Sequence, residues 1–251
     1  MKSLFVISVL SLLIFSCTPT SKRKNDLFYD GIKGKVSGVS MTFYDVTDSS
    51  GKYDKTRASY KFNFDFNPDG NITHQKGVSF QDTAARVIEE TYFIYNNKGI
   101  RIAAQHSKAS KPYTTESYDD NGKLKAIYSL DDQTGKTGKT TKLIYKAGDS
   151  LCEYNVYSSD GKLTDRTVYK SKGDLVTRLT EYDGAGQLIE QSDFGYDAEG
   201  RLVAKAYKTK GQSFKTSIKY ADFDSSGNYL TAVSYTKGKP YQIEKRVLTY
   251  Y

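Results

Sequence analysis

The chain has 251 residues, of which 37% are hydrophobic and 26% are charged, and its mean hydropathy is -0.61. This length suits one large domain or two small ones, and this polarity excludes a protein that crosses a membrane with several helices. The aromatic residues are 22 Tyr and 12 Phe with no Trp. They favour an all-β chain, because tyrosine suits strands that have one dry and one wet edge.

The net charge of +8 comes from 37 basic and 29 acidic residues, which are spread along the chain without a long block of one sign. This distribution is typical of a sheet surface kept soluble by lysine, so nucleic acid is not expected as a partner. A basic surface that rests on anionic headgroups or glycans requires lysines that cluster in space, which a sequence alone does not show.

Residues 1–16 are predicted to be a signal peptide. Lys2 precedes an apolar run from Leu4 to Phe15, which is shorter than the roughly 20 residues of a membrane-spanning helix. The sequence at its end, Ile14-Phe15-Ser16-Cys17, resembles the lipobox of bacterial lipoproteins. The alternative is a plain secretory signal peptide cleaved nearby.

The lipobox resemblance implies that Cys17 is acylated and becomes the N-terminus of the mature protein, with the membrane as a partner through this anchor. Residues 17–26 then form a flexible polar tether. Thr18 differs from the acidic inner-membrane retention signal, so an outer-membrane lipoprotein is implied, facing either the periplasm or the cell surface. Cys152 is then the only other cysteine, and we expect a buried thiol in a strand rather than a nucleophile.

An internal repeat organises residues 27–251, which are predicted to form a single β-repeat domain, most simply a monomer. Glycines recur with a period of about 13 residues, and the pattern around them is aromatic-x-x-x-Gly-x-apolar. Examples are YDDNGKL from Tyr118 and YDAEGRL from Tyr196. The turn glycines of this repeat are Gly70, Gly99, Gly122, Gly161, Gly173, Gly186, Gly200 and Gly227.

The repeat predicts β-hairpins. A type I turn with glycine in the left-handed conformation places the aromatic residue opposite the apolar one, for example Tyr118 opposite Leu124. The same geometry places Asp197 opposite Arg201 in YDAEGRL and, with reversed charges, Lys170 opposite Asp174 in YKSKGDL. The predicted fold class is therefore all-β, an extended antiparallel meander of repeated hairpins that forms one long twisted or curved sheet. An outer-membrane barrel is disfavoured, because LTDRTVY and LVTRLTEY place Asp or Arg near strand centres.

These motifs resemble the YD-repeat (Rhs-like) family over roughly residues 60–251. With GIKGKVSGVSMTFYD at residues 31–45, the chain also resembles small repeat lipoproteins of Bacteroidetes. The resemblance implies a long antiparallel sheet, which in large Rhs proteins spirals into a shell around a toxin. A chain of this length is too short to build a whole shell.

Catalytic groups, metal ligands and cofactor motifs are not evident. His74 and His106 lack neighbours at metal-ligand spacing, and most turn carboxylates are explained by turn chemistry. A glycosidase-like pair, such as Glu89 or Glu90 with Glu116, stays open as the basis of an alternative, an envelope polysaccharide hydrolase.

The leading hypothesis is a non-enzymatic, lipid-anchored envelope module that binds or scaffolds a protein or glycan. A carrier of an apolar ligand is a third, less favoured hypothesis, because it requires an enclosed apolar cavity. Repeated tyrosines could form a platform for sugars or an extended polypeptide. The predicted binding face consists of Tyr118, Tyr157, Tyr169, Tyr182, Tyr196 and Tyr207.

Overall fold

The structure is a computed structural model that describes residues 26–29, 31–46, 52, 57–81, 84–108, 110–120, 123–131, 134–145 and 151–251. The signal peptide, Cys17 and Gly122 lie outside these residues. The described part contains one short helix followed by strands. The elements are α1 (Asp26–Tyr29), β1 (Val36–Asp45), β2 (Tyr60–Phe66), β3 (Ile72–Ser79), β4 (Arg86–Tyr95), β5 (Arg101–Gln105), β6 (Thr114–Tyr118), β7 (Leu124–Leu130), β8 (Thr137–Tyr145), β9 (Leu151–Ser158), β10 (Leu163–Lys172), β11 (Leu175–Asp183), β12 (Leu188–Tyr196), β13 (Leu202–Thr209), β14 (Gln212–Phe223), β15 (Tyr229–Thr236) and β16 (Lys239–Tyr250).

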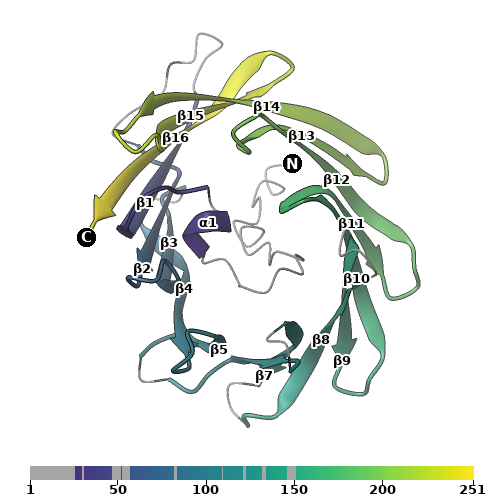
Figure 1. Cartoon of the computed structure of the whole chain (residues 1–251). Helices are drawn as coiled ribbons and strands as arrows, with labels where there is room; N and C mark the ends of the chain where they lie inside the picture. Colours follow the sequence, from purple (N-terminus) through teal and green to yellow (C-terminus); the bar gives the residue numbers. More distant parts are fainter. Residues whose placement is uncertain are drawn as a thin grey trace.

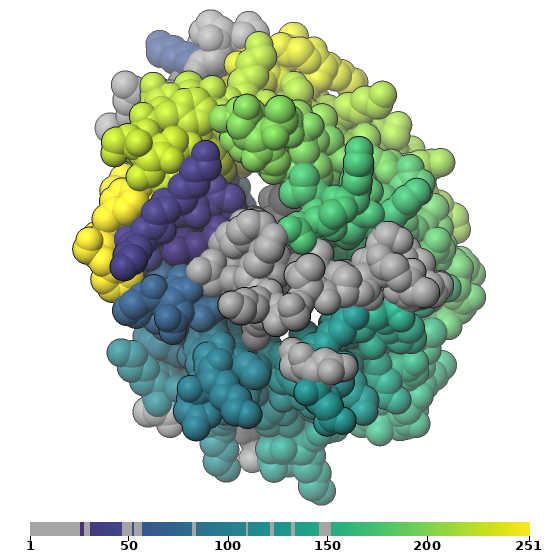
Figure 2. Space-filling model, in the orientation of Figure 1, coloured from purple at the N-terminus to yellow at the C-terminus, as the bar shows by residue number. Residues whose placement is uncertain are grey.

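The strands form a closed antiparallel barrel (Figure 1). Each strand pairs with the next one along the chain, and β1 pairs with β16, with Val39 opposite Leu248. The closing seam is visible in Figure 2, where the purple β1 lies beside the yellow end of the chain. The predicted all-β antiparallel meander is confirmed, and the single long sheet is closed into a barrel rather than being an open twisted sheet. Closure satisfies the backbone groups that two free sheet edges would expose, and the twist of a long sheet brings those edges together.

The inner face of the barrel is identified by α1, which lies within the ring of strands in Figure 1. Leu27 of α1 belongs to a buried apolar cluster with Phe62, Phe64 and Phe66 of β2. These three aromatic residues alternate along the sequence YKFNFDF, so they share one face of the strand. Register then assigns the inner or outer face to residues on every other strand, and the assignment is consistent around the closed ring.

The outer wall is polar. The residues on β2 that point away from the Phe62 side include Lys61 and Asp65, and Asp65 pairs in register with His74 of β3. Other charged residues occupy the outer face by the same register, namely Lys76, Glu90, Lys142, Glu153, Arg166, Arg178, Asp193, Lys215, Lys219 and Lys245. Charges at these positions are costly against lipid, so this wall is suited to water. Among the described residues, no helix is long and apolar enough to span a membrane.

Most of the motif turns have the geometry that the sequence predicts. In YDDNGKL, Tyr118 lies opposite Leu124 and the Asp119 amide donates to the Lys123 carbonyl oxygen over 2.9 Å. Tyr196 lies opposite Leu202 in the same way. The described motif glycines have φ angles from +59° to +82°, and they are Gly70, Gly99, Gly161, Gly173, Gly186, Gly200 and Gly227.

YKSKGDL has a different turn. Lys172 pairs with Leu175, so only Gly173 and Asp174 connect the strands. The predicted pairing of Lys170 with Asp174 is wrong, because Lys170 lies opposite Arg178, and Tyr169 lies opposite Leu179. The physical reason is that β10 continues through Lys172, so the turn contains two residues and the pairing partners shift. The sequence spacing from Tyr169 to Leu175 is the same as in the other motifs. In YDAEGRL the predicted attraction is present, since Arg201 Nε lies 2.7 Å from Asp197 Oδ2.

Candidate functional site

The two ends of the barrel carry different sets of turns. The end where β16 finishes, here called the C-terminal rim, carries the turns that follow even-numbered strands, such as the turn between β4 and β5. The other end, here called the opposite rim, carries the turns that follow odd-numbered strands, such as the turn between β9 and β10. The aromatic-glycine motif occurs at both rims.

At the C-terminal rim, the motif tyrosines point inward and bind the preceding hairpin. The Tyr118 hydroxyl donates to the Arg101 carbonyl oxygen over 2.6 Å, and the Tyr196 hydroxyl donates to the Val176 carbonyl oxygen over 2.8 Å. Three further bonds of this kind occur, from Tyr95 to Ile72, from Tyr145 to Leu124 and from Tyr220 to Leu202. These hydroxyl groups therefore join neighbouring hairpins.

At the opposite rim, the same motif places its tyrosine on the outer face, as register shows for Tyr157 and Tyr182. A hairpin with this turn has one handedness of twist, so the residue before the turn points to a fixed side of the hairpin. When the turn lies at the other end of the barrel, the order of the two strands around the wall is reversed, and that fixed side becomes the outside. The face of each motif tyrosine thus follows from the rim on which its turn lies.

The six tyrosines predicted as one binding face therefore divide into two groups. Tyr118, Tyr169, Tyr196 and Tyr207 lie on the inner face, whereas Tyr157 and Tyr182 lie on the outer face. Tyr169 contacts Tyr154 at a ring-centroid distance of 4.8 Å, and Tyr207 stacks on Phe214 at 4.7 Å. The structure does not bring the six rings together on one surface.

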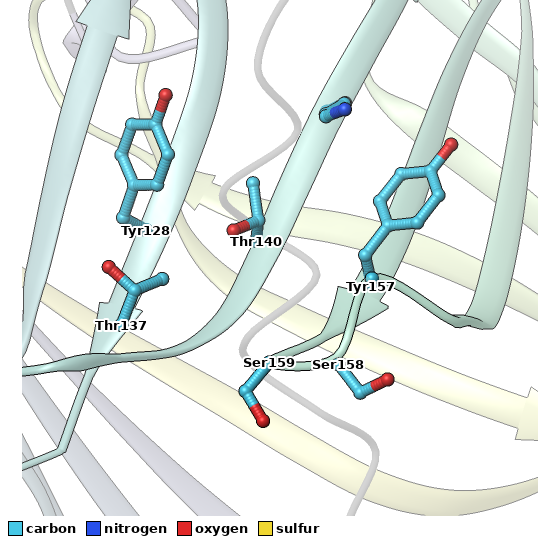
Figure 3. Close-up of a pocket in the computed structure, with 8 residues that line it drawn as sticks. Tyr128, Thr137, Thr140, Tyr157, Ser158 and Ser159 are labelled. Atoms are coloured by element: carbon cyan, nitrogen blue, oxygen red, sulfur yellow. The ribbon is translucent and has the colours of Figure 1, made fainter.

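A groove of about 430 Å³ lies on the outer wall of β7, β8 and β9, close to the opposite rim (Figure 3). Tyr128, Thr140 and Tyr157 are register partners, so they form a row across three strands. Figure 3 shows the two tyrosine rings on either side of Thr140. The rest of the lining comes from β8 and from the turn after β9, namely Thr137, Lys142, Ser158, Ser159 and Gly161.

Within the described part of the chain, the groove presents side-chain hydroxyl groups that are available to a ligand. Among the described residues, no hydrogen-bond partner is found for the side chains of Thr137, Thr140 or Ser159. Ser158 is held in place, because its hydroxyl contacts the Asp160 carboxylate and donates to the Lys162 carbonyl oxygen over 3.0 Å. The hydrogen bond from Ser158 also lowers the pKa of Asp160. Hydroxyls between two aromatic rings suit a ligand that is both polar and stackable.

Lys142 supplies the positive charge of the groove. Its Nζ lies 5.0 Å from the centroid of the Tyr157 ring, within the range of a cation–π interaction. Its register partner on β9 is Asn155, which is 8% exposed and whose Oδ1 has no hydrogen-bond partner in the described part of the chain. A buried acceptor without a donor is uncommon, so the wall beside the groove has capacity to accept one more hydrogen bond.

The carboxylates considered for hydrolysis lie elsewhere. Glu116 is buried with Arg101, and its Oε1 lies 2.6 Å from Arg101 Nε. Glu90 lies on the outer wall, 3.3 Å from both His74 Nε2 and Lys76 Nζ. Glu89 contacts Gln75 on the inner face, and burial raises its pKa. Each of these acids contacts side chains of the barrel wall, and none of them lines the groove.

A second acidic pair was not predicted. Glu181 lies directly opposite Glu190 on the inner face of β11 and β12. Burial raises the pKa of Glu181, and the charges of Glu190 and Asp165 raise it further. Lys205 lies nearby, and its pKa is lowered by burial against the opposing effect of the two glutamates. No sequence signal selects this pair, because it depends on the register of two strands.

The remaining residues singled out from the sequence have ordinary environments. His74 stacks on Tyr92 at 4.3 Å, and His106 stacks on Tyr113 at 4.1 Å. Cys152 is fully buried on the inner face of β9. In the described ranges, no group of three or more His, Cys, Asp or Glu side chains is placed to hold a metal ion.

Tyr157 is among the tyrosines that the repeat motif predicts as a binding face, whereas its partners Tyr128, Thr140 and Lys142 carry no such motif. Tyr128 stands outside the repeat motif, in the middle of LKAIYSL. The available sequence signal was the spacing of two residues between Thr140 and Lys142, which places both side chains on one face of β8.

No protein-family model and no curated protein matches this chain. Among solved structures, it is similar to a porin-like protein from Bacteroides vulgatus, with 12% identity and a TM-score of 0.40 over 87% of this chain and 99% of that one. A porin-like protein from Bacteroides uniformis has 10% identity and a TM-score of 0.39 over 85% and 98% of the two chains. A chain of the Photorhabdus luminescens Tc holotoxin pore has 12% identity and a TM-score of 0.23 over 82% of this chain and 13% of that one. Likenesses at these scores carry no functional argument.

Proposed function

We propose that the protein is a non-catalytic binding module of the bacterial cell envelope, anchored to the outer membrane through lipid on Cys17, and that the groove on β7, β8 and β9 takes a glycan. The observation that carries the proposal is the pair of tyrosine rings, Tyr128 and Tyr157, on either side of side-chain hydroxyls. Sugar rings present apolar faces for stacking and hydroxyls for hydrogen bonding, and the groove offers partners for both.

The chemistry of the lining favours binding over catalysis. Among the described residues, the groove lining contains no carboxylate, so this part of it lacks the pair of acids that glycoside hydrolysis uses. Lys142 adds a positively charged hydrogen-bond donor, which would give preference among polar ligands. An extended polypeptide is the other ligand class in the leading hypothesis, and hydroxyls flanked by tyrosines suit it less well than they suit a polyol.

The test is an array of bacterial polysaccharide fragments probed with the purified full chain. We expect Tyr157→Ala to weaken binding by about tenfold, because an aromatic stacking contact contributes on the order of 1 kcal/mol or more. Tyr182→Ala is the matched control, since Tyr182 occupies the same motif position on the same rim and face but does not line the groove. Equal losses in both variants, or no glycan binding at all, would reject the groove as the site.

Catalysis is tested on the same fragments. Release of new reducing ends by the purified chain would contradict the non-catalytic part of the proposal and support the polysaccharide hydrolase instead. Binding of envelope proteins without binding of any glycan would transfer the proposal to a protein ligand.

A further inference from the structure

Strands β13–β16 lie across the ring from β7, β8 and β9 (Figure 1), and several exposed lysines belong to them and their turns. The turn between β13 and β14 and the turn between β15 and β16 both lie at the opposite rim. The lysines at these two turns and along the outer face of β13 and β14 form the lysine patch, and all are exposed. Its members are Lys208, Lys210, Lys215, Lys219, Lys237 and Lys239.

The described residues form no ion pair with the lysine patch, and the neighbouring Asp193, which lines one surface hollow with Lys215, pairs with Arg178 instead. Between Leu202 and Ile243 the only carboxylates in the sequence are Asp222 and Asp224, and both lie near the C-terminal rim, at the far end of β14. None of the six lysines is within ion-pair distance of a carboxylate belonging to the described residues. Asp222 instead contacts Lys245, which is outside the patch. The charge of the patch is therefore available to an external anion.

Exposed aliphatic side chains adjoin the lysine patch. Leu188 and Ile189 at the start of β12 are 41% and 44% exposed. Glu190, the next residue, is the register partner of Thr209, so these side chains lie beside Lys208 and Lys210 at the same rim. Lysines beside exposed aliphatic groups suit a lipid interface, where headgroup phosphates attract the lysines and the aliphatic groups enter the boundary region.

We propose that the lysine patch docks the opposite rim onto a membrane surface rich in anionic phospholipid. The aliphatic side chains favour this surface over a soluble acidic polysaccharide, because a polysaccharide in water would not bury them. The docking is independent of the acyl chain on Cys17 and of the groove. It would orient the barrel with the β13–β14 and β15–β16 turns against the headgroups.

The test is flotation of the full chain carrying Cys17→Ser, which removes the acylation site, with vesicles of phosphatidylcholine with or without phosphatidylglycerol. We expect binding only to vesicles that contain phosphatidylglycerol, and weaker binding as salt is raised. The combined variant Lys210→Gln, Lys237→Gln and Lys239→Gln, at the two docking turns, should reduce this partitioning by about a hundredfold, since each lysine near an anionic surface contributes about fivefold.

A matched triple variant at the other end of the barrel, Lys98→Gln, Lys125→Gln and Lys172→Gln, removes the same charge from exposed positions and should retain most of the binding. Leu188→Ser with Ile189→Ser should also weaken vesicle binding. Equal losses in the two triple variants would assign the effect to net charge and overturn the patch. Binding to soluble polygalacturonate without binding to vesicles would overturn the lipid assignment. Tyr157→Ala should leave vesicle binding unchanged, so failure of the groove is distinguishable from failure of the patch.

Discussion

The Tyr196 hydroxyl donates a 2.8 Å hydrogen bond to the backbone carbonyl oxygen of Val176, which belongs to the preceding hairpin. Burial raises the pKa of Tyr196 to about 12, so the hydroxyl stays protonated and remains a donor across the physiological range. The bond joins two repeat units that follow one another along the chain. At the C-terminal rim, the motif tyrosines Tyr118 and Tyr196 thus each link their own hairpin to the preceding one.

Loss of this hydroxyl should destabilise the barrel. We expect Tyr196→Phe to lower the free energy of unfolding by about 1 kcal/mol, because the ring is retained and one partly buried hydrogen bond is lost. Urea denaturation measures the change. Tyr182→Phe is the control, since no hydrogen bond of its hydroxyl is found among the described residues, and it should be close to neutral. Equal effects would show that the inter-hairpin bond does not stabilise the fold.

The turn glycine of YDAEGRL should not tolerate a branched side chain. Gly200 has φ of +80°, and Gly200→Val should cost about 1 to 3 kcal/mol because a β-branched residue is strained there. Gly138→Ala is a suitable comparison, since Gly138 has no positive φ and a Cβ there meets only one backbone oxygen at 3.9 Å. A melting temperature of Gly200→Val equal to that of the unmodified protein would reject the turn assignment.

The buried ion pair between Arg101 and Glu116 should contribute strongly to stability. Their side chains are 4% and 5% exposed, so Glu116→Gln leaves a buried guanidinium without its counter-charge, which costs roughly 3 to 5 kcal/mol. The exposed pair of Arg178 and Asp193 gives the contrast, and Asp193→Asn should cost about 1 kcal/mol or less. Chemical denaturation of both variants measures the difference, and similar costs would contradict the buried pairing.

Glu181 should make the stability of the barrel depend on pH. Burial, Glu190 and Asp165 raise its pKa, so the folded chain holds this proton to a higher pH than the unfolded chain does. Stability is therefore lost as the pH rises from the ordinary glutamate pKa through the raised value. Glu181→Gln should raise the melting temperature at neutral pH, and the gain should disappear in acid below the ordinary glutamate pKa.

The control for this titration is Glu199→Gln, at a turn position whose side chain is 57% exposed, which should leave the pH profile nearly unchanged. A gain for Glu181→Gln that persists in acid would point to packing rather than charge. Thermal melts at several pH values separate the two.

The lipid anchor is tested in cells of the source bacterium. Cys17→Ala should move the protein from the membrane fraction to the soluble fraction, because it removes the only proposed acylation site. Retention in the membrane fraction after a high-salt wash would reject the anchor, while retention that salt reverses would be the behaviour expected of the lysine patch.

The sequence alone determined the local structure. The spacing from Tyr118 to Leu124 predicted both the turn and the cross-strand pair, since a glycine in the left-handed region and an aromatic four residues earlier depend on neighbouring residues only. The same reasoning was wrong for YKSKGDL, where Lys172 and Leu175 pair around a two-residue turn. The aromatic-x-x-x-Gly-x-apolar pattern is present there, but the turn differs from the one that this pattern predicts.

The tertiary structure decided closure, the face of each tyrosine and the site. Val39 meets Leu248 only because the twist accumulated over the whole meander brings β1 to β16, and no local pattern contains that sum. Tyr157 points outward and Tyr196 inward because their turns lie on opposite rims, although their motifs are alike. The groove follows from these facts, since Tyr128, Thr140 and Tyr157 come together through the register of three strands and not through proximity in sequence.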